Sequence, residues 1–129
     1  MVKKNPITPN PLVIQVTKPK KDLYDMAESR FHKMISAGAL EEAKSLHENK
    51  KISKTLLKAH GLPELLACVR NKMSLDDAIY DGIQNTKRYI KRQFTWWNNQ
   101  KFSKLNLRIN YKKSFPKDSI ENISIYLNK

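Results

Sequence analysis

The chain has 129 residues, and its 25 Lys and Arg against 12 Asp and Glu give a formal net charge of +13. This length suits one small domain or a piece of a larger one. The charge excludes a mimic of an acidic substrate and points to an anionic partner: nucleic acid, pyrophosphate or a membrane surface.

The single cysteine, Cys68, excludes a disulfide scaffold and is typical of a reducing compartment, so we expect a cytoplasmic protein. No apolar run approaches the roughly 18 residues of a membrane-spanning helix, and residues 1–11 lack the apolar segment of a signal peptide.

The residues that a self-contained enzyme would need are scarce. The three glycines, Gly38, Gly61 and Gly82, are isolated, whereas a loop that cradles phosphates needs clustered glycines. The histidines and the cysteine show no metal-ligand spacing. His60, which precedes Gly61, is interpreted as a polar turn residue. We therefore do not expect a complete active site within these residues.

The pattern of residues predicts a mainly helical chain with one leading strand. Residues 1–11 read as an irregular lead-in, and the β-branched run at 12–17 predicts the strand. One strand cannot pair with itself, so its partner must come from the tail or from a sheet outside this chain. Helices are expected at about 20–37, ending at Gly38, and at 40–49, 53–58, 63–71 and 74–99.

Two sequence signals define the last part of the chain. Ser74, with an acid three residues later, resembles a helix N-cap and predicts the start of the longest helix. The basic tail, residues 101–129, contains two runs with the alternation of a short strand, at 105–109 and 123–127.

Arg30 is the first residue that suggests a ligand. At helical spacing it falls within the apolar stripe of the helix at 20–37, which includes Leu23, Phe31 and Met34. A guanidinium on a buried face needs an anion or other acceptors. On the residues alone two interpretations stay open: a structural ion pair, which is the commoner case, and a contact to a phosphate or pyrophosphate.

The longest helix carries the second candidate site. One flank of its apolar stripe holds four cations and a hydroxyl: Lys87, Arg88, Lys91, Arg92 and Thr95. From Gly82 to Lys117 the sequence has ten Lys or Arg and no acid. A solvated helix face usually mixes charges, because like charges four residues apart repel each other. A plain solvated face is the alternative, but the pattern favours a surface for a phosphate backbone.

With these two segments the chain resembles the C-terminal part of bacterial tRNA dimethylallyltransferases, the isopentenyl-pyrophosphate transferase family. The resemblance covers about Leu12 to Gln100. Its landmarks are Leu23-Tyr24, Glu28-Ser29-Arg30-Phe31, Met34, Ala37-Gly38, Glu41-Glu42-Ala43, Ala59-His60-Gly61 and Lys91-Arg92-Gln93-Phe94-Thr95-Trp96. The last landmark is long and specific.

The resemblance implies an enzyme that moves a dimethylallyl group from its pyrophosphate to the exocyclic amine of the adenosine 3′ of the anticodon. The family fold is a P-loop-type α/β core with an inserted helical domain that grips the anticodon stem-loop, and Mg²⁺ assists the leaving group. This chain would be the C-terminal helical portion of that core. Arg30 matches the family's pyrophosphate-binding arginine, and no residue matches a metal ligand. The Lys58-to-Pro63 turn and the Lys91-to-Asn98 segment match stretches that contact tRNA. Together with Arg88 of the basic flank, the predicted tRNA-binding residues are Lys58, Gly61, Arg88, Lys91, Arg92, Gln93, Thr95 and Trp96.

The sequence also departs from the family pattern. Gly61-Leu62-Pro63 stands where the family has Gly-Tyr-Lys/Arg, Thr86-Lys87 where it has Thr-Arg, and Asn98 where an arginine follows the Thr-Trp pair. The family's P-loop, general-base aspartate and inserted domain would precede Leu12. We therefore expect a fragment that by itself binds tRNA weakly, has no activity and binds no Mg²⁺. Its leading strand would lack the sheet it belongs to, and a separate N-terminal half would be a partner. The alternatives are a non-enzymatic basic RNA-binding helical module and a gene remnant.

Overall fold

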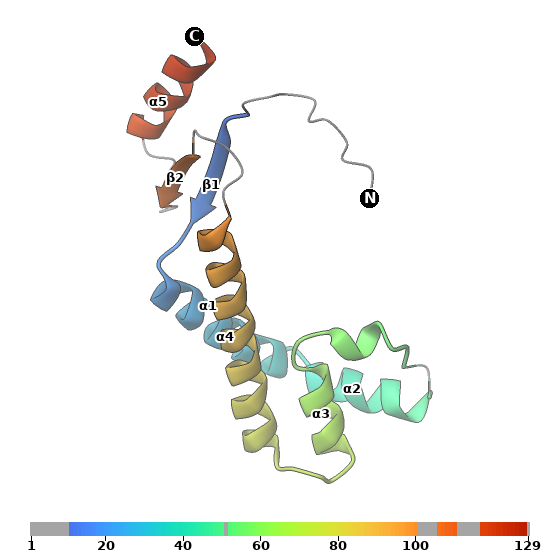
Figure 1. Cartoon of the computed structure of the whole chain (residues 1–129). Coiled ribbons are helices and arrows are strands. Elements are labelled where there is room, and N and C mark those ends of the chain that lie inside the picture. Colours follow the sequence, from blue (N-terminus) through green and yellow to red (C-terminus); the bar gives the residue numbers. More distant parts are fainter. Residues whose placement is uncertain (1–10, 51, 101–105, 111–116, 129) are drawn as a thin grey trace. The chain divides into compact units, whose positions relative to one another are not determined.

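The computed structural model of the chain describes residues 11–50, 52–100, 106–110 and 117–128. Within these ranges the chain is mainly helical, as predicted (Figure 1). It divides into two compact units. The helical unit comprises Lys20–Trp96, and the sheet unit comprises Met1–Pro19 together with Trp97–Lys129. No helix in the described part of the chain combines the length and apolar character needed to cross a membrane.

The helical unit begins with two helices joined by a tight turn. Helix α1 is Lys20–Ser36 and helix α2 is Ala39–Glu48. Gly38 between them has a φ of +100°, a left-handed conformation that glycine adopts without steric cost. The prediction that Gly38 ends the first helix is confirmed, and Gly38 is also the N-cap of α2.

The core of this unit lies between α2 and the next helix. A short 3₁₀ helix, η1 (Leu56–Lys58), leads to Gly61, and α3 (Leu62–Val69) follows. Helices α2 and α3 lie side by side in Figure 1 and pack on each other. Ala43, Leu65 and Leu66 are buried at this contact. The apolar face of each helix therefore supplies this core.

Helix α4 (Leu75–Asn99) is the longest helix in the described residues. Its cap has the predicted chemistry, since the Asp77 backbone N–H donates a hydrogen bond to Ser74 Oγ over 3.0 Å. The Ser74 hydroxyl in turn donates to the Asp77 carboxylate over 2.8 Å. This arrangement satisfies backbone and side-chain groups at the helix start, so the helix begins next to Ser74.

Phe31 of α1 packs against two glycines from other parts of the helical unit. The side chain is 4% exposed. A Cβ atom at Gly61 would lie 2.6 Å from Phe31 Cε2, and one at Gly82 of α4 would overlap the same ring. Gly61 also has a φ of +91°, which independently favours glycine. The missing side chains thus let the Phe31 ring approach both the start of α3 and the middle of α4.

The sheet unit contains a two-stranded parallel sheet. Strand β1 (Val13–Thr17) pairs with β2 (Asn106–Asn110), from Val13 opposite Asn106 to Thr17 opposite Asn110. The Thr17 hydroxyl donates to the Ile109 carbonyl over 3.4 Å. The expectation that the first strand lacks a sheet is therefore wrong, because the tail supplies a partner. Parallel strands need a long connection between them, so the partner is distant in the sequence.

The second run of the tail is not a strand. Residues 123–127 belong to helix α5 (Lys117–Leu127). Its half-buried residues Ile123 and Tyr126 are three positions apart, whereas Ile125 between them is 61% exposed. The burial thus follows a helical period, and the alternation at 123–127 misled the prediction because five residues are too few to separate the two periods. The lead-in at 1–10 lies outside the described residues.

Candidate nucleic-acid interface and anion groove

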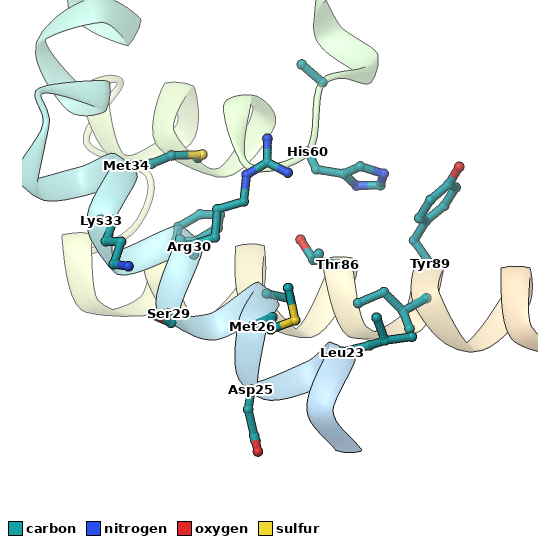
Figure 2. A pocket seen from close by; sticks show the side chains of 14 residues that line it. Leu23, Asp25, Met26, Ser29, Arg30, Lys33, Met34, His60, Thr86 and Tyr89 are labelled. Carbon is teal, nitrogen blue, oxygen red and sulfur yellow. The ribbon is translucent and has the colours of Figure 1, made fainter. Parts of the chain in front are cut away.

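The helical unit contains an open groove with a volume of about 1010 Å³. Helix α1, the turn before α3 and helix α4 form its walls (Figure 2). Its apolar lining includes Leu23, Met34 and Ile90. The polar and aromatic lining residues that matter most below are Arg30, Thr86, His60 and Tyr89. A groove of this size admits a small molecule or a single nucleotide.

Arg30 lines this groove and is exposed. It makes no hydrogen bond or ion pair with any residue that the structure describes. The expectation that Arg30 lies on a buried face is wrong, and the described residues give Arg30 no structural ion pair. The apolar stripe of α1 meets the protein interior at Phe31 and Ile35. Leu23 and Met34 instead line the open groove beside Arg30. A guanidinium left with free donors can bind a phosphate through two parallel hydrogen bonds.

The other charged residues of the groove leave Arg30 free. Lys33 adds a second cation to the lining, and Asp25 is the acid. In Figure 2 the Asp25 carboxylate points away from the Arg30 guanidinium. The Thr86 hydroxyl uses its proton within α4, because it donates a hydrogen bond to the Gly82 carbonyl over 2.8 Å. The groove therefore offers positive charge to an anionic ligand.

An ion pair connects α1 with α4 near this groove. Lys87 Nζ lies 2.8 Å from Glu28 Oε2, and the two side chains are 25% and 48% exposed. The hydrogen bond from Lys87 and then its positive charge hold the pKa of the Glu28 carboxyl below its usual value. Lys87 therefore binds a carboxylate, and the remaining cations of the predicted basic flank are Arg88, Lys91 and Arg92.

This ion pair makes stability depend on pH in a defined direction. The folded-state pKa of Glu28 is lowered, so the unfolded chain binds more protons between the two pKa values and stability rises with pH there. We expect the Glu28–Lys87 contribution to be complete above the ordinary glutamate pKa. It should be lost as the pH falls through the lowered pKa. Thermal unfolding of wild type and Glu28→Gln checks this: their difference should be largest near neutral pH and shrink in acid. A constant difference would contradict the assignment.

Three cations form a continuous basic surface on α4. Arg88, Lys91 and Arg92 are all exposed, and their spacing of three and four residues places them on one face of the helix. Lys91 and Arg92 make no hydrogen bond or ion pair within the described residues. Gln93, Thr95 and Trp96 of the predicted site are also exposed on this helix. We call Arg88, Lys91 and Arg92 the basic face of α4.

Arg88 is held in place by a chain of hydrogen bonds. The Asn85 amide nitrogen donates to Glu64 Oε1 over 2.6 Å, and Arg88 Nη1 donates to Asn85 Oδ1 over 2.8 Å. An ionised carboxylate only accepts hydrogen bonds, so Glu64 orients the amide and directs its oxygen toward Arg88. The other oxygen, Glu64 Oε2, is buried and has no hydrogen-bond partner among the described residues. The network restricts the Arg88 guanidinium and leaves its remaining N–H groups for another acceptor.

The turn before α3 contacts α4 through two aromatic rings. The ring centroids of His60 and Tyr89 are 4.6 Å apart, and the ring planes are tilted by 52°. Of the site residues predicted in this turn, Lys58 is exposed at the end of η1 and Gly61 is buried against Phe31. A contact of either with tRNA stays a prediction. The His60–Tyr89 contact brings this turn to the part of α4 that carries the basic face.

Sequence reasoning missed both contacts between the α3 region and α4. It interpreted His60 as a turn residue, and it did not consider Glu64 and Asn85 together. One signal was present: Gly82 stands in the middle of a long helix, where glycine costs about 1 kcal/mol relative to alanine and usually marks a close approach. The partners themselves are separated by 21 positions for Glu64 and Asn85, and no local pattern relates them.

No metal site is formed by the described residues. They contain no group of three His, Cys, Asp or Glu side chains that could hold a metal ion. The Mg²⁺ that the resemblance implies for a complete enzyme stays a prediction, and we assign it no ligand among the described residues.

Fold and site together define a basic, mainly helical protein with an open groove lined by Arg30 and Lys33 and with an exposed basic face on α4. Residues 2–100 match the family model described as IPP transferase. The chain belongs to this family. It is 38% identical over 96 residues to the tRNA dimethylallyltransferase of Wolbachia pipientis wMel, a match that covers 74% of this chain and 32% of that protein. It is 41% identical over 83 residues to the tRNA dimethylallyltransferase of Rhodopseudomonas palustris, covering 63% of this chain and 26% of that protein.

Solved structures are similar to this chain over most of its length. The full-length tRNA isopentenylpyrophosphate transferase of Bacillus halodurans has a TM-score of 0.72 and 25% identity, over 91% of this chain and 38% of that one. A tRNA isopentenylpyrophosphate transferase of Staphylococcus epidermidis shows the same fold, with a TM-score of 0.70. The chain thus spans about a third of the length of the curated relatives it matches.

Proposed function

We propose that this chain provides the tRNA-facing helix and a pyrophosphate-binding arginine of a tRNA dimethylallyltransferase. The observation that carries the proposal is the exposed basic face of α4 in the same unit as the groove that Arg30 lines. The ligands would be a tRNA anticodon stem-loop and dimethylallyl pyrophosphate. The reaction would transfer the dimethylallyl group to the exocyclic amine of the adenosine 3′ of the anticodon.

Arg30 would act on the leaving group. In the transfer, the bond between the dimethylallyl carbon and the pyrophosphate oxygen breaks, a carbon–nitrogen bond forms, and the amine loses a proton to the family's general-base aspartate. Negative charge develops on the departing pyrophosphate, and a guanidinium with free donors stabilises that charge. We propose that the 129 residues alone transfer no dimethylallyl group, because their three glycines are isolated and form no phosphate-cradling loop. A separate N-terminal half would then be a partner.

A non-enzymatic RNA-binding module would use the same basic face. The observation that favours it is that this face and its hydrogen-bond network are complete within the helical unit. The two functions differ at Arg30, since RNA binding alone does not require a pyrophosphate ligand in the groove. The dependence of prenyl transfer on Arg30, argued in the Discussion, separates them.

The basic face should make RNA binding strongly dependent on salt. Each phosphate contact that is lost makes the slope of log affinity against log salt shallower by about 0.7 to 0.9. Replacing both Lys91 and Arg92 with alanine is therefore expected to reduce the slope by about 1.4 to 1.8. Fluorescence anisotropy of a labelled anticodon stem-loop, titrated with the full chain over a range of salt concentrations, measures both slopes.

A matched control separates the basic face from the overall charge. Lys20 and Lys21 are adjacent, exposed lysines at the start of α1, and their double alanine variant removes the same net charge. Its salt slope should stay closer to that of the wild type. An unchanged slope in the Lys91 and Arg92 variant would show that α4 does not contact RNA.

A further inference from the structure

We propose that the His60–Tyr89 pair is a stacking site for one unpaired base of the bound RNA. This inference rests on the proposed function, because it requires that the chain binds RNA. It assigns the stacking of a base to His60, which belongs to the landmark Ala59-His60-Gly61, and to Tyr89, which lies outside the landmarks. The ligand class is a single-stranded nucleobase, presented by a loop and not by a duplex.

The geometry leaves both rings available. The centroids lie 4.6 Å apart with the planes tilted by 52°, so the rings meet at an angle and neither covers a full face of the other. Tyr89 is 41% exposed and His60 is also exposed. Both rings line the groove and are visible along its wall in Figure 2. The Tyr89 hydroxyl makes no hydrogen bond within the described residues. Tyr89 contacts His60 through its ring.

The surroundings favour a nucleotide over another flat ligand. Arg88 precedes Tyr89 on α4 and is held by the Asn85–Glu64 network, and Arg92 follows one turn later on the same basic face. A nucleotide whose base stacks on the rings is flanked by a backbone phosphate on each side. Cations beside the rings can bind these phosphates. Cations placed next to exposed aromatic rings are the arrangement by which proteins bind single-stranded nucleic acid.

The test is a double-mutant cycle between a ring and a base. The probe is an RNA hairpin with a seven-nucleotide loop, compared with hairpins that carry one abasic site at each loop position in turn. With the wild-type chain, one abasic position should weaken binding about 5- to 150-fold, the size of a base–aromatic stack. With Tyr89→Leu, the same position should cost less than about twofold. Tyr89→Phe keeps the ring and should behave as the wild type.

Tyr80 provides the matched control. It is a tyrosine on the same helix, 64% exposed, and it does not line the groove. Tyr80→Leu should leave the full abasic effect in place. Circular dichroism of each variant verifies that the helices remain folded.

The possible outcomes are distinct. Coupling at one loop position for Tyr89 and not for Tyr80 supports the stacking site. Salt-dependent binding without coupling at any position overturns this inference and leaves the proposed function standing. A chain that does not bind the hairpin overturns both. A cycle in which Tyr80→Leu shows the same coupling also overturns the assignment, because the effect would not be specific to the groove.

Discussion

Replacing Phe31 with alanine is expected to lower the free energy of unfolding of the helical unit by about 3–5 kcal/mol. The ring is 4% exposed and lies against Gly61 and Gly82, so its removal opens a cavity between α1, the start of α3 and α4. Small domains have total stabilities of roughly 5–15 kcal/mol, and this variant should unfold early in a urea titration monitored by circular dichroism. A loss below about 1 kcal/mol would show that the ring does not join these helices.

The glycines test the same contact from the other side. Gly82→Ala places a methyl group against the Phe31 ring, and overpacking of this kind costs about 1–3 kcal/mol. In a Phe31→Leu background the shorter side chain makes room, so the added cost should fall toward zero or change sign, because alanine favours the helix by about 1 kcal/mol.

Gly38 is the control for backbone conformation. Gly38 and Gly61 both have positive φ, +100° and +91°, so alanine strains the backbone at both. The nearest atom to a Cβ at Gly38 is Glu41 Oε2 at 4.0 Å, whereas at Gly61 it is Phe31 Cε2 at 2.6 Å. Gly61→Ala should therefore cost more than Gly38→Ala. Equal costs would assign the requirement for glycine to the backbone alone.

Replacing Arg30 with alanine is expected to have the opposite profile: little effect on stability and a large effect on activity. Arg30 is exposed, so the free energy of unfolding should change by less than about 0.5 kcal/mol. If the residue binds the leaving pyrophosphate, its loss should lower prenyl transfer about 10²- to 10³-fold, as the removal of one charge-stabilising donor does. The assay uses an enzyme reconstituted from this chain and the catalytic part of a curated relative, with tRNA and the prenyl pyrophosphate.

Two variants sharpen the Arg30 prediction. Arg30→Lys keeps the charge but lacks the planar fork of donors, so its activity should also be low. Lys33 lies on the same helix and lines the same groove, so Lys33→Ala removes one charge from the same surface and should reduce activity much less. Loss of several kcal/mol of stability in Arg30→Ala, with full activity, would overturn the assignment.

Local patterns in the sequence predicted most helices of the helical unit, the basic face and the family, but they took the run 123–127 in α5 for a strand. Gly38 and Ser74 predict where helices end and begin because their chemistry is local: one permits a left-handed turn, the other satisfies backbone N–H groups at a helix start. The basic face of α4 was also readable, since residues three and four apart share one side of a helix. The landmarks from Leu23 to Trp96 indicated the family that residues 2–100 match.

Which residues each helix face contacts follows from the packing of the chain and not from local patterns. Periodicity identified the apolar side of α1, but a groove and a core give the same pattern, so Arg30 was expected on a buried face and lies exposed. Glu28 and Lys87 are 59 positions apart, and Glu64 and Asn85 are 21 apart. Strand β1 pairs with Asn106–Asn110, a segment that follows α4 in the sequence. Such contacts depend on how the helices pack, because a local pattern records the character of a surface and not what covers it.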